Sequence, residues 1–331
     1  MRDVLHSSRP SPDPAVPGNF PLLLIFLAAA IGLIDCFWAV KAPFAVDARA
    51  YAMLAAITGL LWAGGYFYGA WRPAPRISAM LFGTGFLVGF TAGASVLNAM
   101  LLTVAGPRID AMLARTDVAL GFDWPAMMRA MADHPGLLKL LYLAYGILLP
   151  EIALAVVVLG LLGRIVSLYR FVLAVAIGAL ICFFVWTLFP SFGAMSIYHF
   201  DPTLAARLGV PVDGAYGDAL IQMLRDGPGR IAPDNVKGLI GFPSYHAVLA
   251  LLLIWHLRHV RGLRWPVLAV NALVIFATPI EGGHHWVDVF AAVPIAALSV
   301  LLAGRIFHGI AQREGSGVLV SPREKRTAPA A

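Results

Sequence analysis

The chain has 331 residues, of which 60% are hydrophobic and only 13% are charged. Soluble domains carry about 25% charged residues, so this composition excludes an ordinary soluble globular protein. The formal net charge of +6 does not indicate a nucleic-acid partner, because the Lys and Arg residues are scattered in short groups between apolar segments.

The apolar segments predict an all-α fold, a polytopic transmembrane helical bundle. Each crossing of a ~30 Å hydrocarbon core takes roughly 20 helical residues. The first apolar segment is too long for a signal peptide, and Asp35 fits poorly in a lipoprotein cleavage box, so we expect an anchor helix there. In chain order the eight predicted spans are 20–40, 51–71, 78–103, 137–162, 168–189, 243–258, 265–280 and 284–304.

The distribution of cations predicts how the bundle is oriented. With the N-terminus in the cytoplasm, 14 of the 24 Lys and Arg residues lie in cytoplasmic loops and tails, as the positive-inside rule requires. We therefore predict a multi-pass protein of the cytoplasmic (inner) membrane with both termini cytoplasmic. Residues 1–19 and 310–331 are expected to be disordered cytoplasmic tails, because they are rich in Pro, Ser and charged residues.

Two long loops, 104–136 and 190–242, then lie on the periplasmic or extracellular side. The segment 109–131 mixes apolar and charged residues, which favours helices lying on the membrane surface. The second loop is rich in Pro and Gly, so we expect irregular backbone at the mouth of a site. The two cysteines, Cys36 and Cys182, both fall in apolar segments and support neither a disulfide framework nor a zinc site.

Two clusters of polar residues occur at the outer ends of predicted spans. Residues 241–247 read Gly-Phe-Pro-Ser-Tyr-His-Ala, and Pro243 suits the first turn of a helix that contains Ser244 and His246. Residues 281–289 read Glu-Gly-Gly-His-His-Trp-Val-Asp-Val. His284 and Asp288 are four residues apart and share one helix face, so Asp288 can accept a hydrogen bond from one imidazole nitrogen and leave the other free to react.

A Pro-Ser-x-His segment followed some forty residues later by His-x-x-x-Asp resembles the type 2 phosphatidic acid phosphatase (PAP2) superfamily. The flanking residues 242–247 and 278–288 look most like the branch related to inositol phosphorylceramide synthase. This resemblance implies a membrane catalytic domain over 78–304 with a six-helix core, and leaves 20–71 as two accessory transmembrane helices. It also implies a phosphotransferase or phosphatase that acts on a lipid phosphate or a phospholipid headgroup.

Carried over residue by residue, the resemblance makes His284 the nucleophile that forms a phosphohistidine, Asp288 its orienting partner and His246 the acid/base for the leaving oxygen. The chemistry agrees, because neutral imidazole accepts phosphoryl groups well and an alkoxide leaving group needs a proton. Ser244 would donate a hydrogen bond to a phosphate oxygen. We expect no cofactor. The expected partners are a lipid substrate and, for a transferase, an alcohol acceptor.

The chain departs from the wider superfamily in its cations. The first motif, a Lys followed seven positions later by Arg-Pro, is missing, and Ala277-Thr278 stands where Ser-Arg would precede His284. Lys237 and Arg230, upstream of the 241–247 segment, are therefore the expected phosphate-binding residues. The next candidates are Arg108, Arg115 and Arg129.

A metal site built from His246, His284, His285 and Asp288 is the chemical alternative. Adjacent histidines on a helix diverge too far to chelate one ion easily, and no His-x-x-x-His or Glu-x-x-His spacing occurs among them. His285 is instead expected to pack or to hydrogen-bond to a loop.

Other functions stay open at the level of sequence. A plain lipid phosphate phosphatase is the alternative enzyme, and a transporter or non-catalytic membrane protein is the alternative class. A transporter would be expected to have interrupted helices with polar residues near mid-membrane, whereas the histidines here cluster at one face. Glu151, in the middle of a span, is expected to hydrogen-bond to another helix, because an unpaired carboxylate at that depth is costly.

Overall fold

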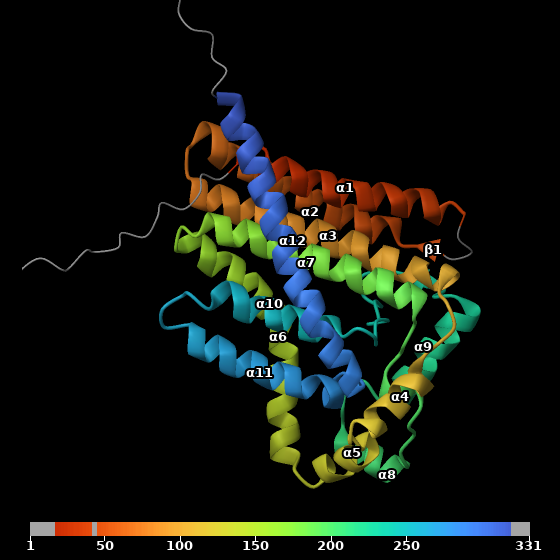
Figure 1. Cartoon of the computed structure of the whole chain (residues 1–331). Helices are drawn as coiled ribbons and strands as arrows, with labels where there is room; N and C mark the ends of the chain where they lie inside the picture. The colour runs from red at the N-terminus through yellow and green to blue at the C-terminus, as the bar shows by residue number, and fades with distance from the viewer. Residues whose placement is uncertain (1–16, 42–44, 319–331) are drawn as a thin grey trace, which may run out of the picture.

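The computed structural model describes residues 17–41 and 45–318. Helices make up almost all regular structure in these residues, and β-structure is limited to β1 (Ala45–Val46) paired in parallel with β2 (Arg230–Ile231). The predicted all-α helical bundle is therefore confirmed (Figure 1). The helices are α1 (Phe20–Ala39), α2 (Ala48–Tyr66), α3 (Pro75–Leu101), α4 (Asp110–Ala119), α5 (Trp124–Ala132), α6 (Pro135–Leu161), α7 (Ile165–Leu188), α8 (Pro202–Leu208), α9 (Gly214–Asp226), α10 (Tyr245–Leu257), α11 (Arg264–Glu281) and α12 (Trp286–Val318).

Six helices in the described part of the chain are long and apolar enough to cross a membrane: α1, α2 with its π-helical extension to Trp71, α3, α6, α7 and α12. The other two predicted crossings, 243–258 and 265–280, correspond to α10 and α11, which are helices but are not among these six. α10 has only 13 residues, which cover about 20 Å at 1.5 Å per residue. It is short because its first turn starts at the buried Ser244, inside the bundle rather than at its surface.

The connecting segments meet at two opposite ends of the bundle. At one end Arg164, before α7, donates to the carbonyl of His259 (2.8 Å), which joins the α6–α7 and α10–α11 turns. At the other end the Ala194 N–H donates to the Gly283 carbonyl (2.6 Å). The loops that the cation pattern assigns to one membrane face are thus joined to one another. α4, α5, α8 and α9 lie together at the second end (Figure 1).

Both long loops, 104–136 and 190–242, contain helices. α4 and α5 occupy the segment in which surface helices were predicted. α8 and α9 were not predicted as helices, and they interrupt the irregular backbone that was expected in 190–242. Each begins at an aspartate N-cap: Asp201 accepts from the N–H groups of Thr203 and Leu204, and Asp213 accepts from that of Tyr216. These caps satisfy amide groups that a helix start leaves free.

The last helix is longer than predicted. α12 continues to Val318, so the disordered tail predicted from residue 310 is wrong for 310–318. The end of α12 is held against the start of α1, because the Glu314 carboxylate accepts from the N–H groups of Gly18 (2.7 Å) and Asn19 (2.9 Å). The tails predicted at 1–16 and 319–331 lie outside the described residues.

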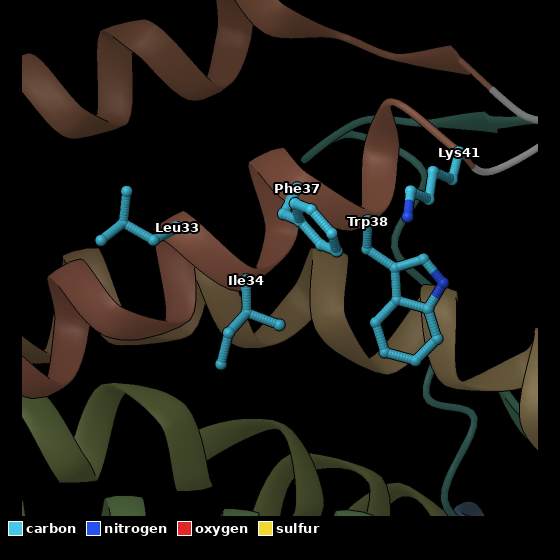
Figure 2. A pocket seen from close by; sticks show the side chains of 5 residues that line it. All are labelled: Leu33, Ile34, Phe37, Trp38 and Lys41. Atoms are coloured by element: carbon cyan, nitrogen blue, oxygen red, sulfur yellow. The ribbon is translucent and has the colours of Figure 1, made fainter.

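The outer face of α1 is apolar and open (Figure 2). Leu33 and Phe37 are 71% and 68% exposed, and the Lys41 ammonium lies 4.6 Å from the centre of the Phe37 ring at the end of the helix. Such a surface suits contact with acyl chains, with the lysine reaching toward the polar interface. Both cysteines are free thiols, Cys182 in the core and Cys36 exposed on this helix.

Candidate active site

The structure brings the two sequence motifs together. Ser244 and His246 stand at the start of α10, and His284 lies in the loop between α11 and α12. The Ser244 hydroxyl oxygen is 3.5 Å from Nε2 of His284, and the ring centres of His246 and His284 are 6.5 Å apart. Residues some forty positions apart in the chain therefore form one site.

The surroundings of His284 fix which ring nitrogen carries the proton. Its Nδ1 is 2.8 Å from the Gly241 carbonyl oxygen and 3.2 Å from Oδ2 of Asp288. A carbonyl oxygen can only accept a hydrogen bond, so Nδ1 must be the protonated nitrogen. In the neutral ring Nε2 then keeps its lone pair and faces Ser244. Burial lowers the pKa of His284 to about 4, so the ring is neutral at physiological pH.

Asp288 ties the two motifs to one another. Its Oδ2 accepts from the His285 N–H (2.8 Å) and faces His284, while its backbone carbonyl accepts from the Ser244 N–H (3.1 Å). The side chain is fully buried. Asp288 is thus placed to orient His284 and to stabilise positive charge on its ring.

His246 has a different environment. Its ring stacks on Tyr145 of α6, with ring centres 4.6 Å apart and an angle of 20° between the planes. The histidine is only partly buried, and no hydrogen bond ties its ring nitrogens to another described residue. It is therefore free to meet a substrate oxygen. Tyr145 was not recognised from the sequence, because nothing in its local pattern marks it.

Glycines let the loops approach this closely. A side chain at Gly282 would lie 2.8 Å from the Tyr145 hydroxyl and 3.0 Å from the His284 ring. Gly193 has φ +83°, and a Cβ there would lie 2.3 Å from the Gly283 carbonyl oxygen. The segment before α8 thus packs directly on the histidine loop.

Asp110, on α4, organises the loop behind His284. Its buried Oδ1 accepts from the Ser191 hydroxyl and from the N–H groups of Phe192 and Gly193, at 2.7 to 3.0 Å. Ser191 in turn accepts from the Gly241 N–H through its carbonyl (2.8 Å). Asp110 therefore helps to position the Gly241 carbonyl that holds His284.

Asp117, about two turns after Asp110 on α4, caps α12. It accepts from the N–H groups of Trp286 (2.9 Å) and Val287 (3.0 Å). Nδ1 of His285 lies 3.6 Å from Oδ2 of Asp117, and His285 is completely buried. His285 therefore packs against a neighbouring element, as predicted.

The expected phosphate-binding cations do not contact the histidines. Arg230 pairs with Asp47, and the ammonium of Lys237 lies 4.6 Å from the centre of the Tyr216 ring. Arg108 is held by Asp110 and Ser196. Arg115 and Arg129 are exposed on α4 and α5.

Two other cations lie next to the histidine loop. Lys139 and Arg207 line a cavity of about 340 Å³ together with Glu281, which immediately precedes Gly282. Neither residue was predicted as a ligand, because both lie far from the two motifs in the chain.

Glu151 makes the interhelical hydrogen bond that was predicted. Its Oε1 accepts from the side-chain amide of Asn271 on α11 (2.9 Å). Among the described residues, no group of three or more His, Cys, Asp or Glu side chains has a geometry that could hold a metal ion.

Comparison with known proteins gives one result. A family model described as the PAP2 superfamily matches residues 111–302, which is more than half of the chain and includes both motifs. No curated protein and no solved structure gives a significant match.

Proposed function

The chain belongs to the PAP2 superfamily, and we propose that it is an integral membrane enzyme that removes or transfers the phosphoryl group of a lipid phosphate. The superfamily consists generally of phosphoesterases. The observation that carries the proposal is the state of His284: its Nδ1 proton is directed to Gly241 and Asp288, so Nε2 is a neutral nucleophile facing Ser244.

In the first step Nε2 of His284 attacks phosphorus, and the bond from phosphorus to the lipid oxygen breaks. His246, whose ring is protonated once the anionic phosphate lies next to it, gives its proton to that leaving oxygen. Ser244 donates a hydrogen bond to a phosphate oxygen. His284 becomes a phosphorylated imidazolium, and its positive charge is stabilised by Asp288, 3.2 Å from Nδ1.

In the second step a hydroxyl compound attacks the phosphohistidine. His246, now neutral, takes the proton of the attacking oxygen, the phosphorus–nitrogen bond breaks and neutral His284 returns. Water as acceptor releases inorganic phosphate, whereas an alcohol gives a new phosphate ester. The three proposed catalytic residues serve both outcomes equally, so they do not choose the acceptor.

We favour transfer to an alcohol, as in the branch related to inositol phosphorylceramide synthase. Support comes from residues 242–247 and 278–288 and from the outer segment that covers the site. Gly217 of α9 packs against the Met195 backbone, and Met195 packs against Gly283. A covered site limits access of water to the intermediate. Lys237 is our candidate for contacting the phosphate, because a ring contact and not an ion pair holds its ammonium group.

The acceptor is tested with purified protein, phosphatidic acid in mixed micelles and an excess of EDTA. We expect turnover to persist in EDTA, because the proposed groups need no metal. Rising concentrations of an alcohol should divert product from free phosphate to a phosphodiester or a new monoester, with ping-pong kinetics. If no alcohol competes with water while phosphate release stays fast, the protein is a plain lipid phosphatase. Loss of activity that one metal restores would favour a metal mechanism.

We also propose that the site faces the periplasm or the cell exterior, with both termini in the cytoplasm. The support is the cation asymmetry. In a background without Cys36 and Cys182, we expect Gly214→Cys to react with an impermeant maleimide in intact spheroplasts and Ser316→Cys to stay unlabelled. The reverse pattern would overturn the orientation.

A further inference from the structure

A second cavity lies among α1, α2 and α3, outside the segment that the family model matches. Its volume is about 630 Å³, within the usual range of ~300–1,000 Å³ for pockets that bind small molecules. Most of its wall consists of Ala and Gly residues. The lining includes no Lys, Arg or His.

Three polar groups on residues that line this cavity have no hydrogen-bond partner in the part of the chain that the structure describes. Oδ1 of Asp35, Oγ1 of Thr58 and Nε1 of Trp62 are buried and make no hydrogen bond. The Asp35 and Thr58 residues are only 7% and 5% exposed. Polar groups without partners are costly inside a membrane, where no water replaces the missing bonds. A bound molecule that supplied those bonds would remove this cost.

A glycine row on α3 positions the three groups. Gly85, Gly89 and Gly93 recur every fourth residue and so share one helix face. Added side-chain carbons would lie 2.8 Å from Nε1 of Trp62 at Gly85, 2.9 Å from the Thr58 methyl at Gly89 and 3.3 Å from Oδ2 of Asp35 at Gly93. The polar groups therefore follow one another along the helix at intervals of about one turn, ~5.4 Å.

The chemistry of the lining defines the ligand. The Trp62 N–H needs an acceptor, whereas the Asp35 carboxyl group can receive a hydrogen bond from a donor. A hydroxyl group that donates to Asp35 and an ester carbonyl that accepts from Trp62 together supply both. An anionic phosphate does not fit, because the wall offers it no cation and Asp35 would repel it. The Ala and Gly wall accommodates a hydrocarbon chain.

We infer that this cavity binds an uncharged lipid that carries a free hydroxyl group, with the hydroxyl on Asp35 and a chain along the Ala and Gly wall. A diacylglycerol has this chemistry. The site lies on α1, α2 and α3, whereas the two histidines lie on α10 and in the loop before α12, so it is separate from the catalytic centre. The inference does not depend on the reaction proposed above.

The test is photo-crosslinking of the purified full-length protein with a diacylglycerol that carries a diazirine in one chain. Labelled peptides are mapped by mass spectrometry. We expect labelling of α1, α2 and α3 that unlabelled dioleoylglycerol displaces. Its O-acetyl derivative, which lacks the free hydroxyl, should displace the probe about fivefold less well, as expected for one lost hydrogen bond. Asp35→Leu should abolish that difference.

Two leucine substitutions distinguish binding of the probe in the cavity from its general contact with the lipid-facing surface. Gly32 lines the cavity and a side chain there meets no atom within 4 Å, so Gly32→Leu should fill the cavity and suppress labelling. Gly59 on α2 is equally open but does not line the cavity, so Gly59→Leu is the matched control and should label normally. The inference would be overturned if both variants were labelled equally. It would also be overturned if dioleoylglycerol and its acetyl derivative displaced the probe equally well from the unsubstituted protein. Either result would indicate bulk lipid contact. Displacement by phosphatidic acid as effective as by dioleoylglycerol would also contradict it.

Discussion

Replacing His284 with alanine is expected to reduce phosphoryl turnover to background, because it removes the nitrogen that forms the covalent bond to phosphorus. His246→Ala should lower turnover by ~10²–10⁴, the usual contribution of general acid–base catalysis. The assay is phosphate release from phosphatidic acid by purified protein. The loss of turnover in His246→Ala should be smaller for a substrate whose leaving group is a weak base, since such a leaving group needs little protonation.

His199 provides the matched control. It is an exposed histidine of the segment 190–242, so His199→Ala should leave turnover close to that of the unsubstituted protein. Each variant must elute as a monodisperse species from size-exclusion chromatography. A folded His284→Ala protein with normal turnover would remove the nucleophile from the mechanism.

Asp288→Ala is expected to be nearly as harmful as loss of the nucleophile, because Asp288 provides the negative charge next to the ring that becomes positive. Asp288→Asn separates the two roles of this residue. The Gly241 carbonyl, at 2.8 Å, still receives the Nδ1 proton in that variant, so the tautomer is preserved while the charge is lost. We therefore expect Asp288→Asn to lower turnover but to retain more of it than Asp288→Ala.

Pre-steady-state kinetics check this second prediction. The substitutions should slow formation of the phosphorylated enzyme more than they weaken substrate binding, since the charge on the ring develops only during the reaction. If Asp288→Ala, folded and membrane-inserted, were as active as the unsubstituted protein, the orienting role would be wrong.

The sequence was informative where the signal is local. Runs of apolar residues located the long helices to within a few residues, as in α1 and α7. The two motifs pointed to the residues that the structure brings together. The predicted helix face shared by His284 and Asp288 is wrong, because His284 lies in the loop before α12, yet its ring still contacts Asp288. The hydrogen bond of Glu151 followed from the cost of a free carboxyl group at that depth.

The remaining features depend on long-range contacts that no local pattern encodes. The Gly241 carbonyl and Asp110 act on His284 from segments far apart in the chain, and the backbone carbonyl belongs to a residue with no side chain to attract notice. α12 continues past residue 309 because Glu314 contacts the start of α1, at the other end of the sequence. Arg230 was expected at the phosphate because it precedes the 241–247 segment, yet its partner Asp47 lies on the segment before α2.

The central claim is that His284 carries the phosphoryl group, and trapping the intermediate tests it most directly. Purified protein is mixed with radiolabelled phosphatidic acid, quenched in alkali within milliseconds and digested for mass spectrometry, because phosphohistidine is stable to alkali and labile to acid. The account predicts one phosphorylated peptide, with the label on His284, and none in His284→Ala. A label on Ser244 or His246, or rapid turnover of substrate with no phosphorylated protein at any time, would contradict it.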